Sequence, residues 1–349
     1  MKRFIKLSLV FVGLVSIFLL FSSHKPLSTF FCTKTLEDIN VDIRNDKYGK
    51  ISSLIIYQGP RILYEKYYGF SQPTTLHPIS SVTKSITSIA VGICIDQGFI
   101  PSLDVKIQDY FPEFKEIFDK DPLKQMITLR HLLNQTSGLK WNEWDIHYSY
   151  AGNPLIELSQ SNINWCHFII SLPMDSIPGK KFSYNSGLSE LIKEMISRST
   201  GVDFKLFVEE NIFKKMKIST YHWDLYAENG VPAWGGLSLC TRDMAKFGTL
   251  ILFKGVWANT RIVSEEWINL AISPLVVSDK VKYGLHWWIG DQPDGNPMIF
   301  AAGYGDQYIY IAPDKDLVVA FNGQNFTDHK WDYNHDDLIM NILNAYNNN

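Results

Sequence analysis

The sequence has few cysteines and no spacing that would pair them. Its four cysteines, Cys32, Cys94, Cys166 and Cys240, lie far apart in the chain. Zinc sites use closely spaced Cys or His pairs, and small disulfide-stapled domains are dense in cysteine, so neither class is indicated. We expect core cysteines, and a single disulfide in an oxidising compartment stays open.

Long runs of one charge, internal repeats and low-complexity segments are also lacking. The 33 basic and 36 acidic residues leave a net charge of -3, and no basic stretch stands out. Nucleic-acid-binding modules carry a basic patch or a Cys/His pattern, so we expect no nucleic-acid partner. With 349 residues, of which 46% are hydrophobic, the chain is suited to an ordinary globular core.

Motifs of two other hydrolase classes are missing. There is no H-x-H-x-D-H run, so metal-dependent lactam hydrolysis has no support, and no G-x-S-x-G nucleophile elbow, which argues against an α/β-hydrolase. The stretch DHKWDYNHDD at 328–337 gathers carboxylates and histidines without the ligand spacing of zinc. We interpret it as solvated surface and expect no metal site.

The N-terminus resembles an export segment. Lys2, Arg3 and Lys6 precede an unbroken apolar stretch of 15 residues, 7–21, which polar residues follow at once. A membrane-spanning helix needs about 20 residues, so this stretch is short for a retained anchor. A cleaved signal peptide is not clearly indicated either, because the cleavage site is poor and no lipobox precedes Cys32. A cleaved signal and a retained anchor both stay open.

We therefore divide the chain into three parts. Residues 1–25 are a signal peptide or membrane anchor, 26–44 a polar linker, and 45–349 one domain. The basic residues before the apolar stretch, Lys2, Arg3 and Lys6, stay on the cytoplasmic side, which places that domain on the outer face of the membrane. We therefore expect an exported, periplasmic or extracytoplasmic protein that contacts the membrane only through its N-terminal segment.

Patterns of hydrophobic residues predict an α+β fold. Segments 51–57 and 61–68 have the composition of two strands, joined at Gly59-Pro60 as a hairpin, and strands return from residue 283. The region 102–232 is mostly helical in pattern, and 336–346 predicts a closing helix. We expect one antiparallel sheet flanked by helices, an inserted all-helical lobe, and a site in the crevice between them.

Ser81 and Lys84 stand one turn apart at the head of an apolar helix. A serine hydroxyl becomes a nucleophile when a base takes its proton, and a residue at i+3 faces the same side of a helix. Lysine acts as that base when burial lowers its pKa. The pattern S-x-x-K occurs three times in the chain, but only Ser81 opens a convincing helix. The alternative is a helix cap with a solvated lysine.

Tyr184 is a second candidate. It lies in FSYNSG, just before an amphipathic helix. A lysine cation nearby lowers the pKa of a tyrosine hydroxyl, which then relays a proton between nucleophile and leaving group. The alternative is a core tyrosine with a satisfied hydroxyl.

Five ordered segments, SVTKS, LRHLLNQTSGL, PGKKFSYNSG, WGGLSLCTRDMAKFG and AAGYGDQYIYIAP, resemble the serine β-lactamase-related superfamily. This superfamily contains class C β-lactamases, D-alanyl-D-alanine carboxypeptidases and esterases, and the resemblance covers roughly residues 45–345. It implies the β-lactamase/transpeptidase-like fold. The segments WGGLSL, YGLHWW and GYGDQ are most similar to the 6-aminohexanoate-dimer hydrolase branch.

The resemblance implies roles for individual residues. Ser81 would be the acylated nucleophile, Lys84 its activating partner and Tyr184 the general acid/base, with no cofactor. Ser186 would take the third place of the Y-x-N element. The oxyanion would lie between the Ser81 N–H and a backbone N–H beside Gly303, that of Tyr304.

One departure from the family pattern bears on the substrate. The third motif usually supplies a cation as Lys-Thr-Gly, but this chain reads Ala-Ala-Gly at 301–303. Because such a cation pairs with a substrate carboxylate, we favour hydrolysis of a small-molecule ester, amide or peptide whose acyl group is uncharged or is recognised in another way. A β-lactamase or D-Ala-D-Ala carboxypeptidase, and a catalytically silent cell-envelope binding protein, stay open.

Aromatic residues could line an acyl pocket. Trp234, beside Gly235-Gly236, is the best candidate, whereas Trp141, Trp144, Trp287 and Trp288 are individually more typical of core packing. The segment 140–154 mixes aromatic and polar residues without periodicity, which indicates a loop over the cleft, hypothetically a lid. The sequence leaves the oligomeric state open.

Overall fold

The computed structural model describes residues 34–278, 281–326 and 335–347, and the statements below concern these ranges. The predicted export segment, Cys32 and most of the 328–337 stretch lie outside them. Within these ranges, no helix combines the length and apolarity that crossing a membrane requires.

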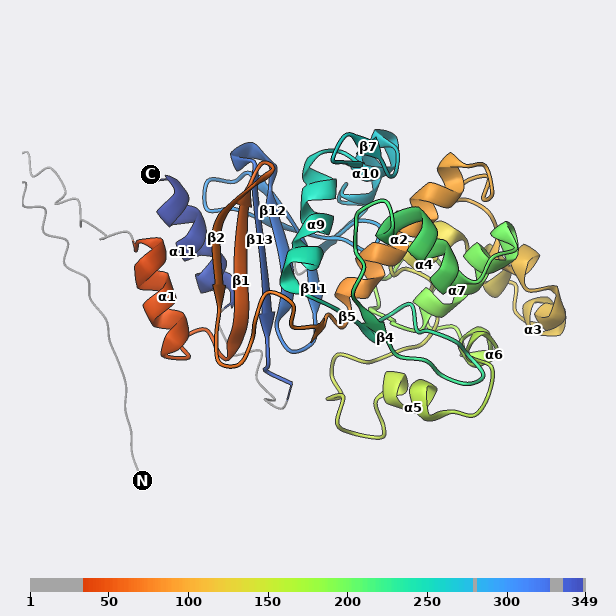
Figure 1. The fold of residues 1–349 in the computed structure, drawn as a ribbon. Helices are drawn as coiled ribbons and strands as arrows, with labels where there is room; N and C mark the ends of the chain where they lie inside the picture. The colour runs from red at the N-terminus through yellow and green to blue at the C-terminus, as the bar shows by residue number, and fades with distance from the viewer. Residues whose placement is uncertain (1–33, 279–280, 327–334, 348–349) are drawn as a thin grey trace, which may run out of the picture. The chain divides into compact units, whose positions relative to one another are not determined.

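One eight-stranded antiparallel sheet forms the centre of the fold (Figure 1), with the order β2-β1-β13-β12-β11-β10-β9-β8. The predicted N-terminal hairpin is confirmed, and the C-terminal strand β13 pairs with β1, so the two ends of the domain meet in one sheet. The strands are β1 Ile51–Gln58, β2 Arg61–Tyr67, β8 Val276–Val277, β9 Lys282–Tyr283, β10 Trp288–Asp291, β11 Pro297–Gly303, β12 Gln307–Ala312 and β13 Leu317–Gly323.

Helices cover both faces of this sheet (Figure 1). Helices α1 Leu36–Arg44 and α11 His335–Asn347 pack on one face in their own hydrophobic core. On the other face, α9 Thr241–Leu252 and α2 Val82–Asp96 belong to the larger core, which continues into the helical part of the protein. Alternating strand residues supply the two cores, as the period of a strand requires.

Helix α1 lies where the sequence analysis expected a linker. Thr35 and Asp38 form a reciprocal capping box at its start, and Ile39 and Ile43 are buried at helical spacing. The cap and the apolar face together stabilise a helix in a segment of mostly polar composition. The folded unit therefore begins before residue 45.

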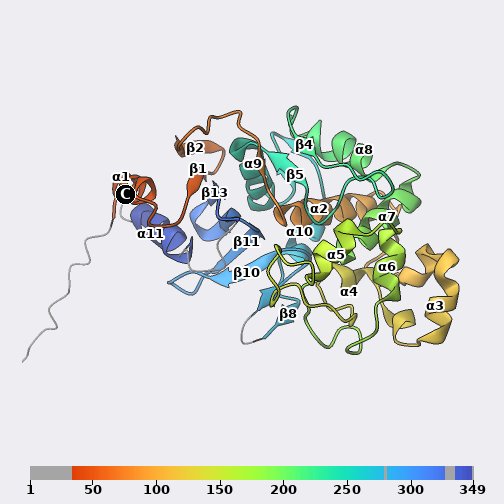
Figure 2. The same ribbon diagram turned by 90° about the horizontal axis from the view of Figure 1, so that it is seen from below.

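The region between β2 and β8 is mostly helical, as predicted (Figure 2). It is not all-helical, because β4 His222–Trp223 lies within it and joins β3 His77–Pro78 and β5 Leu237–Leu239 in a three-stranded sheet. A hairpin of β6 Val256–Trp257 and β7 Thr260–Arg261 follows. The further helices are α3 Lys115–Lys120, α4 Leu129–Leu133, α5 Pro154–Gln160, α6 Trp165–Ser171, α7 Leu188–Thr200, α8 Phe204–Val208 and α10 Glu265–Ala271. Short 3₁₀ turns lie at Ile107–Tyr110, Pro112–Phe114 and Lys124–Met126, and a π-helical turn, Glu209–Phe213, continues α8. Another 3₁₀ turn, Pro313–Lys315, joins β12 to β13.

The segment YGLHWWIG was expected to form one strand, but the chain turns within it. The Gly284 N–H donates to the Trp287 carbonyl, and His286 takes a positive φ of 60°. The turn separates β9 from β10 and directs the His286 side chain into the protein, where it is 1% exposed. This position matters for the site described below.

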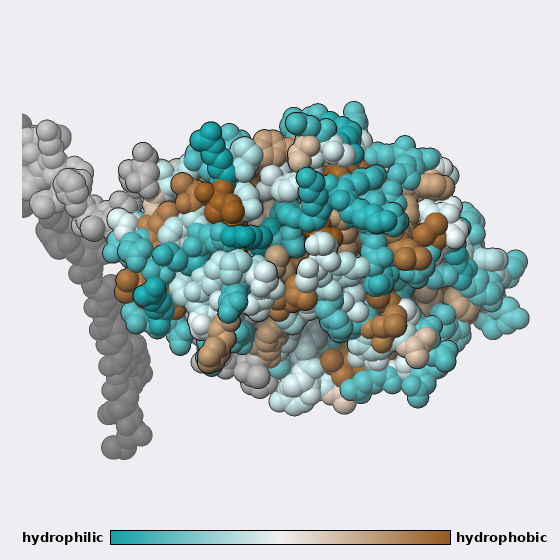
Figure 3. Space-filling view, in the orientation of Figure 1, coloured by the Kyte–Doolittle hydropathy of each residue, from teal (hydrophilic) through white to brown (hydrophobic). Residues whose placement is uncertain are grey.

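Three cysteine thiols are described, and all three are free. Cys94 and Cys166 are buried and Cys240 is half-buried. The expectation of core cysteines is confirmed for the first two. Polar residues cover most of the face shown in Figure 3, and apolar residues are exposed there in separate small patches.

Candidate active site

Ser81 lies at the N-terminal end of α2, directly after a sharp turn of the chain. Ser80 has a φ of 48°, in the left-handed region that non-glycine residues rarely adopt. Its hydroxyl donates to the Tyr304 carbonyl over 2.9 Å, which ties the turn to the end of β11. The turn places Ser81 at the start of the helix, and Lys84 follows one turn later.

The Lys84 amine is buried beside the serine hydroxyl. Lys84 is 1% exposed, and its Nζ lies 2.9 Å from Ser81 Oγ and 3.2 Å from the Trp234 carbonyl oxygen. Burial lowers the pKa of Lys84 to about 8, although Glu143 and Glu190 act to raise it. The lowered pKa that a lysine base requires is therefore present.

Tyr184 completes the cluster. Its ring centroid lies 5.0 Å from Lys84 Nζ, and its hydroxyl is near enough to Ser81 for the serine side chain to affect the pKa of Tyr184. The sequence analysis expected a lowered pKa, but burial, together with Glu143, raises the pKa of Tyr184, and the Ser81 side chain only partly offsets this. Tyr184 thus keeps its proton at neutral pH.

Two backbone N–H groups beside the serine are free. Among the described residues, neither the Ser81 nor the Tyr304 N–H has a hydrogen-bond partner. Gly303 allows the two segments to approach, because a Cβ there would lie 2.3 Å from the Ile79 carbonyl oxygen. Both residues line one pocket, so their unpartnered N–H groups are candidates for binding an oxyanion there.

A pocket of about 190 Å³ opens at Ser81. It is lined by Ser80, Ser81, Tyr148, Leu155, Trp234, Gly235, Gly236 and Tyr304. The structure thus brings Trp234 and Tyr304 to the serine. By contrast, Trp287 is buried in the core, and Trp288 stacks on Tyr184.

The segment 140–154, which was expected to be a loop over the cleft, reaches this pocket through Tyr148, one of its lining residues. Tyr148 packs against the Tyr304 ring at 4.9 Å, and His147 Nε2 lies 3.1 Å from the Tyr304 hydroxyl. Trp144 stacks on Tyr184 with ring centroids 5.3 Å apart. Aromatic contacts therefore hold this loop to both walls of the cleft.

Glu143, on the same loop, was missed by the sequence analysis. It is 1% exposed, and its carboxylate accepts hydrogen bonds from the Ser186 N–H and hydroxyl, both at 2.7 Å. Trp141 Nε1 and the Tyr148 hydroxyl donate to it as well, at 2.6 and 3.0 Å. The Ser186 side chain is thus occupied by Glu143 and does not line the pocket, contrary to the expected substrate-binding role.

Two further buried groups, His286 and Gln135, connect the segments that carry Lys84 and Tyr184. His286 Nδ1 lies 3.1 Å from the Lys84 carbonyl oxygen, and its Nε2 lies 3.2 Å from Gln135 Nε2. Gln135 Oε1 in turn accepts from the Asn185 N–H at 2.6 Å. Burial and Lys84 lower the pKa of His286 to about 3, so this link between α2 and the Tyr184 segment is neutral.

Glu190 supports the irregular segment before β5 that carries Trp234. Its carboxylate accepts from the Ala233 N–H at 2.7 Å and pairs with Lys193. Burial raises the pKa of Glu190, and Lys193 partly offsets this effect. No sequence motif pointed to these groups. Within the described ranges, no three His, Cys, Asp or Glu side chains cluster as metal ligands would.

Comparisons with known proteins agree with this geometry. The chain is 23% identical over 282 residues to 6-aminohexanoate-dimer hydrolase of Paenarthrobacter ureafaciens, covering 76% of this chain and 71% of the relative. Its fold is similar to that of EstCE1, a hydrolase with promiscuous acyltransferase activity, with a TM-score of 0.70, 13% identity, and coverage of 89% and 98%. It is also similar to the octameric penicillin-binding protein homologue of Pyrococcus abyssi, with a TM-score of 0.68, 20% identity, and coverage of 88% and 76%.

A family model covers most of the domain. The model described as Beta-lactamase matches residues 51–340, from the first strand into the last helix. The fold class expected from the five ordered motifs is confirmed by this match. The chain belongs to the Beta-lactamase family, the serine β-lactamase/transpeptidase superfamily.

Proposed function

We propose that this protein is a serine hydrolase that cleaves an ester or amide through a covalent acyl-serine. The observation that carries the proposal is the 2.9 Å contact between Ser81 Oγ and the buried Lys84 amine. An amine whose pKa is about 8 is partly neutral near pH 7 and accepts the hydroxyl proton. The relative named as a 6-aminohexanoate-dimer hydrolase is consistent with this reaction class.

The proposed reaction has two half-reactions. In the first, Lys84 takes the Ser81 proton, Oγ attacks the carbonyl carbon, and the N–H groups of Ser81 and Tyr304 bind the oxyanion. Tyr184 donates its proton to the leaving group, and the Lys84 ammonium reprotonates Tyr184. In the second, the neutral Lys84 amine takes a proton from water as the water attacks the acyl carbonyl, the resulting ammonium gives that proton to Ser81 Oγ as the ester bond breaks, and the acid is released.

The pocket favours an uncharged acyl group. None of the side chains that line it is a lysine or arginine that would pair with a substrate carboxylate. Its walls are Tyr148, Leu155 and Trp234, and its volume of about 190 Å³ is below the range of drug-sized sites. We therefore propose short neutral acyl groups as the preferred substrates.

The experiment is a substrate panel on the purified domain. Short-chain p-nitrophenyl esters, aminohexanoate oligomers, D-Ala peptides and a chromogenic cephalosporin are compared by kcat/KM. Turnover of the neutral esters or amides supports the proposal. Turnover confined to cephalosporin or D-Ala peptides would favour the β-lactamase or carboxypeptidase alternative, and binding without turnover of any compound would favour a silent binding protein.

Substitution of Glu143 tests the electrostatics of the site. Glu143 raises the pKa of Lys84, so Glu143→Gln should lower that pKa further. Because the neutral amine is the active form, the midpoint of the pH–rate profile should move to lower pH, by about one unit. The profile of kcat/KM on a p-nitrophenyl ester measures this shift. A midpoint that stays in place or moves to higher pH would contradict the assignment.

Gly303→Ala tests the proposed oxyanion site. The new Cβ would push the end of β11 away from Ile79, so the Tyr304 N–H should move off the oxyanion position. Loss of one such donor typically lowers kcat by about 10²- to 10³-fold. The matched control is Gly290→Ala on β10, where a Cβ meets its nearest atom at an ordinary 3.4 Å. Equal activity of the two variants would disprove the role of this strand end.

We also propose that the protein is exported. The support is the apolar stretch 7–21 behind Lys2, Arg3 and Lys6. Expression of the full chain followed by cell fractionation tests this, and N-terminal sequencing separates a cleaved signal from a retained anchor. Recovery of the full-length chain in the soluble intracellular fraction would contradict it.

A further inference from the structure

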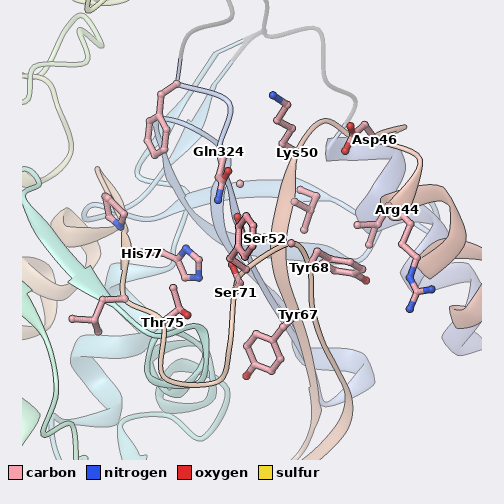
Figure 4. Close-up of a pocket in the computed structure, with 18 residues that line it drawn as sticks. Arg44, Asp46, Lys50, Ser52, Tyr67, Tyr68, Ser71, Thr75, His77 and Gln324 are labelled. Atoms are coloured by element: carbon pink, nitrogen blue, oxygen red, sulfur yellow. The ribbon is translucent and has the colours of Figure 1, made fainter.

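A second, larger cavity lies away from Ser81. Its volume is about 930 Å³, within the range of small-molecule sites, and it opens between the first hairpin, the end of α1 and the loop 68–78 (Figure 4). It shares no lining residue with the pocket at Ser81. We propose that this cavity is a binding site for a short neutral saccharide.

The first support is a buried polar atom without a partner. His77 lines the cavity and is 6% exposed, yet its Nε2 has no hydrogen-bond partner. Burial lowers the pKa of His77, so the ring is neutral. A buried, unpaired polar group costs free energy unless water or a ligand satisfies it. Figure 4 shows the His77 ring on the same side of the cavity as Thr75 and Ser71. Its Nε2 has almost no exposed surface, so a ligand that pairs with it must displace the packing over this atom.

The second support is the chemistry of the walls. Ser52, Ser71 and Thr75 bring hydroxyl groups to the cavity, and Tyr68 brings a ring. Phe70 also lines it and is fully exposed to solvent, an unusual position for a large apolar ring. Flat rings beside neutral donors and acceptors suit a sugar, whose C–H face packs on a ring while its hydroxyls form hydrogen bonds.

The charges at the cavity favour a neutral ligand. Arg44, Lys50 and Asp46 line it and are all exposed, and no ion pair joins them to each other. Charges of both signs in open solvent are screened and select weakly for an anion or a cation. The His77 imidazole and the hydroxyl groups of the cavity wall are more buried than these charged side chains. They therefore decide which class of ligand binds, and they favour a neutral one.

The site can be occupied while Ser81 reacts. His77 lies on β3, four residues before the proposed nucleophile, but the two cavities have separate linings. A saccharide in the larger cavity would therefore leave the pocket at Ser81 open. The inference is thus independent of the proposed hydrolysis.

Calorimetric titration with maltotriose, cellotriose and triacetylchitotriose tests the proposal, with inorganic phosphate as the anionic probe. At least one saccharide should bind saturably with a Kd of about 1 mM or tighter, and equally well to wild type and to Ser81→Ala. Phe70→Ser should weaken that binding about tenfold, because the exposed ring contributes stacking and little to the fold. The matched control, Phe99→Ser, removes another exposed phenylalanine outside the cavity and should bind normally.

His77→Leu gives a second, independent readout. It removes an unpartnered nitrogen, so the free protein should keep its melting temperature, while saccharide binding should weaken. The proposal is overturned if no saccharide binds saturably, if only phosphate binds, if Phe70→Ser and His77→Leu both bind like wild type, or if Ser81→Ala abolishes binding.

Discussion

Ser81→Ala should abolish turnover of the best ester substrate, with kcat reduced by about 10⁴-fold or more. The nucleophile has no substitute nearby, because the Ser80 hydroxyl is already committed to the Tyr304 carbonyl. Binding in the 190 Å³ pocket should persist, since the substitution removes only the Ser81 hydroxyl from its lining. Steady-state kinetics on a p-nitrophenyl ester gives kcat, and equilibrium binding of a non-hydrolysable analogue gives the affinity.

The matched control for this variant is Ser88→Ala. Ser88 lies on the same helix and is fully buried, and its hydroxyl has no hydrogen-bond partner. Its loss should leave kcat/KM unchanged, because it touches neither substrate nor the reacting atoms. If Ser81→Ala hydrolysed the ester as fast as Ser88→Ala does, Ser81 would not be the nucleophile.

Lys84→Met should lower kcat by about 10³- to 10⁴-fold and remove the pH dependence that a base near pKa 8 imposes. Methionine fills similar space without an amine, so the Ser81 hydroxyl loses its proton acceptor. The fold should hold, because the buried amine carries a desolvation cost that methionine does not. The pH–rate profile, taken with the melting temperature, separates loss of the base from loss of structure.

Lys124→Met is the matched control for the lysine. Lys124 is 5% exposed, burial lowers its pKa, and its Nζ donates to the Ile170 carbonyl, away from the cluster at Ser81. Both variants remove a buried amine, but only Lys84→Met should lose activity. A comparable loss of activity in Lys124→Met would assign the effect to stability rather than to proton transfer.

Local sequence signals predicted much of the fold. The hairpin at Gly59-Pro60 and the helix after Ser81 were readable because turn residues and apolar spacing act over a few residues. The capping box of Thr35 and Asp38 was also a local signal, but the polar composition around it suggested a linker. The turn at Gly284–Trp287 was not readable, since it depends on a positive φ at His286.

The candidate site was only partly predictable. Ordered motifs placed Ser81, Lys84 and Tyr184 together, and the structure brings them into one cluster. Glu143 could not be found, because the Ser186 groups that bind it lie 43 residues away in the chain. The predicted direction of the Tyr184 pKa shift was wrong, because burial and the nearby Glu143, which both follow from tertiary packing, raise this pKa.

The most direct test is the pH dependence of Ser81 labelling by a fluorophosphonate, with the modified peptide identified by mass spectrometry. Because attack requires the neutral amine, the labelling rate should rise with pH and reach half its maximum near the Lys84 pKa of about 8. One adduct on Ser81 with that profile is the expected result. No adduct, an adduct on another residue, or a rate that is flat from about pH 6 to 10 would contradict the Ser81–Lys84 mechanism.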